Sequence, residues 1–95
     1  MKTKVDVEIT GGFRNAGIIL ETKKISLDED FKFSGNIEFI PPMVDAVAVI
    51  KGSRNASYNV KITINGITME KKGFITKANG RQVVDIKYKF SDFHL

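Results

Sequence analysis

Apolar and polar residues alternate along most of this chain, and the alternation is clearest around the dipeptide Asn65-Gly66. Residues 58–64 and 67–70 each place apolar side chains at every second position on either side of that dipeptide. An Asn-Gly pair in this setting predicts a β-hairpin, because a type I′ turn needs positive φ at both central residues. The expected cross-strand pairs, all favourable combinations, are Ile64–Ile67, Ile62–Met69, Thr63–Thr68 and Lys61–Glu70.

Similar alternation predicts strands in the rest of the chain. In the run from Phe31 to Ile40, Ser34-Gly35 suggests a bulge or bend. Ser26-Leu27-Asp28-Glu29 fits a capping box, but no amphipathic repeat follows it, so we expect at most one helical turn there. The expected strands cover residues 5–10, 18 to 24 or 25, 31–40, 43–50, 58–64, 67–70, 74–78 and 84–90.

The segment from Met43 to Ile50 differs from the others because both of its faces are mostly apolar. This pattern predicts a central strand that is covered on both sides. A short helix, with Pro42 at its start and Gly52 as its C-cap, is the alternative interpretation. The density of β-branched residues favours the strand.

A second Asn-Gly pair, Asn79-Gly80, predicts a second hairpin between residues 74–78 and the last strand. If Ala78 and Arg81 flank this turn, Phe74 lies opposite Asp85 on the polar face of the hairpin. A longer loop that shifts the register, or a second sheet over this face, would bury Phe74 instead.

About eight short strands at regular spacing indicate an all-β fold. We expect an antiparallel β-sandwich with a C-terminal meander, formed by one domain over residues 1–95. A small oligonucleotide-binding-type β-barrel is the alternative fold.

Few residues suit catalysis or metal binding. The chain has no cysteine, which excludes disulfides, thiolate metal sites and cysteine nucleophiles. The sole histidine, His94, is the penultimate residue, and no serine lies in a nucleophile elbow. Asp28-Glu29-Asp30 lacks the ligand spacing of a calcium loop. We therefore expect a protein that is not an enzyme and needs no cofactor or metal. No apolar h-region follows the basic residues near Met1 and no apolar run is long enough to span a membrane, so we expect no signal peptide, no membrane partner and a cytoplasmic location.

Charge is distributed unevenly along the chain. Residues 1–50 hold six Lys and Arg against eight Asp and Glu, net −2, whereas residues 51–95 hold nine against three, net +6. The leading hypothesis is a protein-binding or assembly module of the inhibitor, immunity, adaptor or particle-accessory type, which acts through exposed aromatics and self-associates through edge strands. Single-stranded nucleic-acid binding by the basic half, or carriage of a small apolar ligand, are the alternatives. The candidate binding residues are Phe74, Lys71, Lys72, Lys77, Arg81, Lys87 and Lys89.

Overall fold

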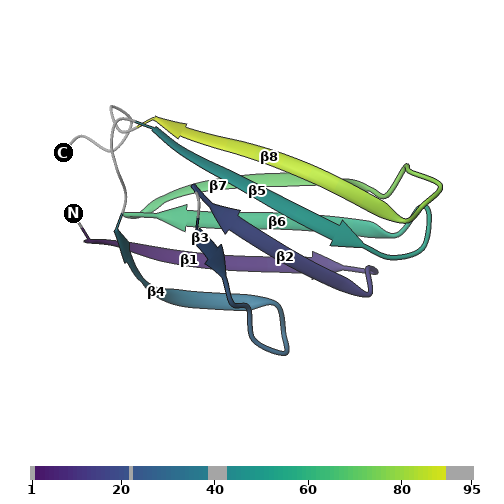
Figure 1. Ribbon diagram of the computed structural model, residues 1–95, viewed down its shortest axis with the longest axis horizontal. Helices are drawn as coiled ribbons and strands as arrows, with labels where there is room; N and C mark the ends of the chain where they lie inside the picture. The colour runs from purple at the N-terminus through teal and green to yellow at the C-terminus, as the bar shows by residue number, and fades with distance from the viewer. Residues whose placement is uncertain (1, 22, 39–42, 90–95) are drawn as a thin grey trace.

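Two four-stranded antiparallel sheets pack face to face and form a β-sandwich (Figure 1). The computed structural model describes residues 2–21, 23–38 and 43–89, and side chains are described for all of these except 2, 43, 44, 88 and 89. The all-β sandwich prediction is confirmed. The described strands are β1 (Lys2–Gly11), β2 (Asn15–Leu20), β3 (Lys23–Ile25), β4 (Lys32–Glu38), β5 (Met43–Lys51), β6 (Ser57–Ile64), β7 (Ile67–Phe74) and β8 (Arg81–Lys89).

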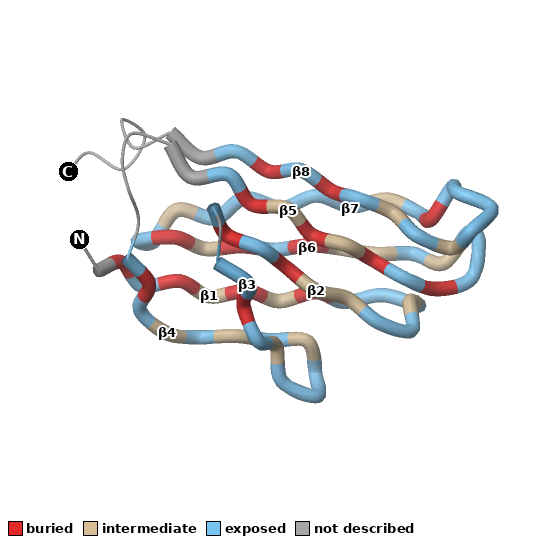
Figure 2. The backbone as a smooth tube through the Cα atoms, in the orientation of Figure 1, coloured by how far each residue is buried: buried red, intermediate tan, exposed pale blue. Residues whose placement is uncertain are grey.

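The strand order is β4-β1-β6-β7 in one sheet and β3-β2-β5-β8 in the other. Burial alternates along the central strands, as the bands in Figure 2 show. In β1 the buried apolar side chains are Val5, Val7 and Ile9, and their register partners Ile64, Ile62 and Val60 in β6 are buried as well. Each of these side chains contributes about 1.5–3 kcal/mol by leaving water. The core therefore lies between the two inner faces.

The predicted hairpin at Asn65-Gly66 is confirmed in its turn and in its register. Asn65 has φ 51° and Gly66 has φ 84°, as a type I′ turn requires. The Oγ atoms of Thr63 and Thr68 lie 2.8 Å apart across the strands. All four predicted cross-strand pairs occur between β6 and β7.

The predicted end of a strand at Glu70, with a new strand at 74–78, is wrong. Instead, β7 continues to Phe74, which pairs with Ser57 rather than Asp85. Gly73 stays in the strand because the ring of Tyr58 lies over the place where a Cβ would be. The Lys-Lys-Gly sequence therefore reflects an exposed edge strand and not a turn.

The second predicted hairpin is wrong in its turn and in its pairing. The turn is closed by a hydrogen bond of 3.0 Å from the backbone N–H of Gly80 to the carbonyl oxygen of Lys77, so Ala78 and Arg81 do not flank it, and of Asn79 and Gly80 only the glycine has positive φ. Gly80 has φ 74°, and Asn79 Oδ1 accepts a hydrogen bond of 3.1 Å from the backbone N–H of Arg81. Residues 75–80 cross to the other sheet, where β8 pairs with β5. The turn signal is local, whereas the partner of β8 is set by packing between sheets.

Two further strand predictions need correction. The strand expected from Ile18 onward ends at Leu20, since Glu21 has φ 57° and the chain reverses into β3. No bulge occurs at Ser34-Gly35, which pairs in regular register with β1. The ring of Phe33 packs over Gly35 and fills the space that a side chain would occupy.

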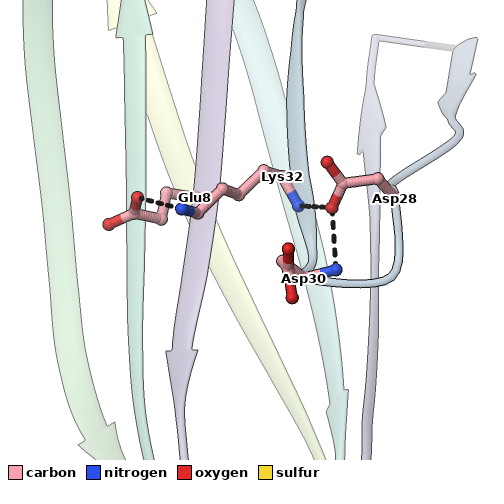
Figure 3. Close-up of polar contacts among 4 residues, drawn as sticks. All are labelled: Glu8, Asp28, Asp30 and Lys32. Atoms are coloured by element: carbon pink, nitrogen blue, oxygen red, sulfur yellow. Dashed lines mark hydrogen bonds and ion pairs between the residues drawn. The ribbon is translucent and has the colours of Figure 1, made fainter.

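Asp28 shapes the β3–β4 loop, where at most one helical turn was expected and none forms (Figure 3). Its Oδ1 accepts hydrogen bonds from the backbone N–H groups of Asp30 (2.8 Å) and Lys32 (3.0 Å). Beyond the loop, Lys32 Nζ lies 3.6 Å from Glu8 Oε2 on the outer face of the first sheet. The carboxylate at position 28 is thus used to shape the loop.

Candidate functional site

Strand β5 places Val47 and Val49 outward and its two alanines inward. Ala46 and Ala48 are buried in the core, while Val47 and Val49 are half-buried on the outer face of their sheet. β5 is central in its sheet, as predicted. The prediction that both of its faces are covered is wrong. Only the inner face is covered, because the two sheets described make a single sandwich.

Neighbouring strands extend the apolar surface around the two valines. Ile19 of β2 pairs with Val47 and is 40% exposed, and Val83 of β8 pairs with Val49 and is 55% exposed. We call Ile19, Val47, Val49 and Val83 the outer apolar face. These four side chains form two adjacent cross-strand rows.

A hollow lies beside these rows at Gly17, which pairs with Val49. A Cβ at Gly17 would have no heavy atom within 4 Å. The hollow belongs to a groove of about 600 Å³, whose opposite wall includes Leu27 and Phe31 of the β3–β4 connection. The outer apolar face is therefore concave on the β2 side.

Charged residues of opposite sign lie at the two ends of the outer apolar face. Lys51 and Arg81 pair with each other at the end beyond Val49 and Val83. At the other end, Asp85 pairs with Val47, and Asp45 lies two residues further along β5. That end also carries Glu21, whose Oε1 accepts a 3.1 Å hydrogen bond from the Asp45 backbone N–H, together with Lys24 and Lys87.

The two aspartates at this acidic end interact directly. A side-chain hydrogen bond to Asp85 raises the pKa of the Asp45 carboxyl above its ordinary value, and partial desolvation and the charge of Asp85 add to this effect. Lys87, which pairs with Asp45, acts in the opposite direction. The acidic end thus has a protonation state that depends on pH.

Three loops meet at one end of the sandwich, on the right in Figure 1. They are the β1–β2, β5–β6 and β7–β8 connections, and backbone hydrogen bonds join them. Arg14 N–H donates to Lys51 O (2.8 Å), Gly52 N–H donates to Gly80 O (2.9 Å), and Asn55 N–H donates to Ile75 O (2.7 Å). Gly52 is buried among them, so these loops form one connected unit.

This end of the molecule is strongly basic. The sequence has no Asp or Glu in residues 9–20, 46–69 or 71–84, the segments that contain these loops. We use the name basic loop end for its exposed cationic residues Arg14, Lys51, Arg54, Lys77 and Arg81.

The structure brings part of the predicted binding set to this end. Phe74 is 62% exposed on the outer, polar face of its sheet, and Lys72 lies two residues away on the same face. Lys77 and Arg81 belong to the basic loop end. The predicted position of Phe74 on a polar face is therefore correct, although its predicted partner is not.

Other members of the predicted set lie elsewhere. Lys71 pairs with the buried Val60 and so lies on the opposite side of β7 from Phe74. Lys87 lies toward the far end of β8, opposite Asp45. The side chain of Lys89 and the whole of His94 are outside the described residues. The predicted residues thus do not form one surface.

Sequence reasoning missed Arg14, Lys51 and Arg54, which come from two other loops. A usable signal existed, namely three separate segments without any acidic residue. Antiparallel strands bring alternate connections to the same end of a sandwich, so these segments could have been combined.

Within the described residues, no group of three or more His, Asp or Glu side chains is arranged to hold a metal ion. None of these residues belongs to a helix that is long and apolar enough to cross a membrane. Comparison of the chain with protein-family models, curated proteins and solved structures found no match. Inference about function therefore begins from the two surfaces above.

Proposed function

We propose that this chain is a non-enzymatic assembly module that binds a second copy of itself through the outer apolar face. The observation that carries the proposal is the orientation of β5, with Val47 and Val49 outward and two alanines inward. A sheet face that meets only water normally carries polar residues. The two valines on the outer face therefore favour a surface that another sheet covers.

The charges around the outer apolar face support a second copy as the occupant. In a symmetric dimer, both copies use the same patch. A two-fold axis that runs across the strands reverses their direction, so the basic end of one copy lies over the acidic end of the other. Lys51 and Arg81 then approach Asp45 and Asp85 of the second copy. This complementarity fixes the orientation more than it adds affinity.

Two of the four edge strands, β7 and β3, offer a less suitable route to self-association than the face. β7 carries the consecutive lysines Lys71 and Lys72, one on each of its faces, and lysines on an edge discourage pairing with another sheet. β3 has three residues, which is too short to template a new strand. The proposal therefore replaces edge-strand pairing with packing of one sheet face on another.

The affinity is expected to be modest. Four apolar side chains with a polar rim make a small interface compared with the roughly 20–30 residues per side of a standard one. We expect a dissociation constant of about 10–100 µM, which corresponds to about 5–7 kcal/mol.

Sedimentation velocity over about 5–500 µM tests the proposal, since this range brackets the expected constant. The wild-type chain should shift from monomer to dimer as its concentration rises. Val83→Lys should remain monomeric, because it places a charge in the centre of the face beside Arg81. Its unfolding midpoint should stay close to that of the wild type, as Val83 is exposed.

Met69→Lys is the matched control. Met69 is also an exposed large apolar residue, at 38%, but it lies on β7 in the other sheet. This variant should dimerise as the wild type does. A wild-type chain that stays monomeric up to the highest concentration, or equal dimerisation of both variants, contradicts the proposal.

A further inference from the structure

We propose that the basic loop end, together with Phe74, binds single-stranded nucleic acid. This site lies on the loops and at the end of the β4-β1-β6-β7 sheet, apart from the four residues of the outer apolar face. Lys51 and Arg81 also border the outer apolar face, so the test of nucleic-acid binding uses Phe74, Arg54 and Lys77, which have no part in the proposed dimerisation.

Phe74 provides the surface on which a base stacks. Its side chain is 62% exposed at the last position of β7, and it is an aromatic residue on an otherwise polar sheet face. It borders a groove of about 480 Å³ that also includes Thr10, Asn59 and Lys72. Base stacking on an exposed aromatic tolerates any sequence, because every base has a π-face.

Cationic residues follow Phe74 along the β7–β8 loop and lie on the β5–β6 loop, which is bonded to it. The residue that follows it, Ile75, exchanges backbone hydrogen bonds with Asn55 and Ala56, which places Arg54 nearby in the chain. Lys77 follows on the same loop. Lys72 contributes less, because its Nζ lies 3.6 Å from Glu70 Oε1. Arg54 and Lys77 are therefore the cations best placed to contact phosphates next to a stacked base.

The nearest run of acidic residues is separated from this part of the site. Asp28, Glu29 and Asp30 belong to the β3–β4 loop, which projects on the side of the molecule away from the β7–β8 loop (Figure 1). The β3–β4 loop contacts the β1–β2 loop instead, because Phe31 packs on Phe13 with ring centroids 5.1 Å apart. The acidic residue close to Phe74 is instead Glu70, whose carboxylate accepts a hydrogen bond from Asn59 and lies 3.6 Å from Lys72 Nζ, so it offsets Lys72 and leaves Arg54 and Lys77, among the described residues, as the unpaired cations of this part of the site.

The backbone bonds among the three loops hold these side chains on a fixed base. Gly80 is required at its position, since a Cβ there would clash with the carbonyl oxygen of Gly52. Preformed placement of the cations lowers the ordering cost of binding. The short dimensions of the sandwich are 23 and 21 Å, so its end spans about four nucleotides at roughly 6 Å each, similar to the smallest sites of single-strand-binding domains.

Fluorescence anisotropy with labelled oligo-dT and oligo-rU of eight nucleotides tests the proposal, and the two probes distinguish DNA from RNA as the source. We expect binding that weakens with salt, with a log–log slope near −0.7 for each phosphate contact. Phe74→Ala should weaken binding about tenfold without changing the slope, because it removes stacking and no charge. Arg54→Gln and Lys77→Gln should each make the slope shallower by about 0.7.

Lys87→Gln is the matched control, because it removes one charge far from the loops and should leave the slope unchanged. Polyphosphate of similar length tests whether bases matter, and it should bind more weakly than either oligonucleotide. The proposal is overturned if neither oligonucleotide binds at low salt, if Phe74→Ala binds as the wild type does, or if Lys87→Gln changes the slope as much as Lys77→Gln.

Discussion

The ring of Tyr58 lies directly over Gly73 on the inner side of the β6–β7 pair. A Cβ built on Gly73 would lie 2.6 Å from the Tyr58 hydroxyl oxygen and 2.9 Å from its Cζ. The two residues are cross-strand partners, so the aromatic ring replaces the side chain that glycine lacks. This contact keeps the last part of β7 in the sheet and places Phe74 at its end.

Gly73→Ala should therefore destabilise the fold by about 1–3 kcal/mol, because the Tyr58 ring must move from its position. Gly17→Ala is the control, since a Cβ at Gly17 meets open space, and it should be neutral or stabilising by a few tenths of a kcal/mol. Chemical denaturation of the two variants measures the difference. Equal stability would contradict the packing of Tyr58 on Gly73.

Gly66→Val should cost about 1–3 kcal/mol for a purely conformational reason. A side chain at Gly66 would contact nothing within 4 Å, yet φ 84° is strained for a β-branched residue. Gly66→Asn should cost less, as asparagine tolerates this region. An unchanged denaturation midpoint for Gly66→Val would contradict the type I′ turn at this position.

The Asp45–Asp85 contact should make stability depend on pH. Because the folded-state pKa of Asp45 is raised, its contribution is fully present below the ordinary aspartate pKa and is lost as the pH rises through the raised value. Asp85→Asn removes the partner that raises the pKa. The free energy of unfolding of this variant, relative to that of the wild type, should therefore increase as the pH rises above about 4. A difference that is constant from pH 3 to 7 would argue against the contact.

Local signals in the sequence predicted the first hairpin and failed for the second. Asn65-Gly66 joins strands that pair with each other, so the turn and the alternation of Ile62 and Ile64 were sufficient. Asn79-Gly80 instead ends a crossover to the other sheet, in a turn where Gly80 alone of the pair has positive φ. The alternation of apolar residues in β8 is compatible with pairing to any strand, and only packing between the two sheets determines that β8 pairs with β5.

The candidate surfaces were predictable to different degrees. The two-sided apolar pattern of Val47 and Val49 pointed to a covered strand, and the uncovered side of that strand became the proposed interface. The grouping of Arg14 and Arg54 with Lys77 depends on which loops share an end of the sandwich, which follows from topology. A division of the charge into two halves of the chain could not show this grouping.

Cross-linking of single-cysteine variants tests most directly whether the outer apolar face joins two copies. The chain has no cysteine, so Val49→Cys puts the only thiol at the centre of the face, and Lys61→Cys puts it on the outer face of the other sheet. Packed sheets lie about 10 Å apart, within reach of a short bismaleimide. We predict rapid dimer formation by Val49→Cys and slow, collisional cross-linking by the more exposed Lys61→Cys. Equal rates, or faster reaction at position 61, would contradict self-association through this face.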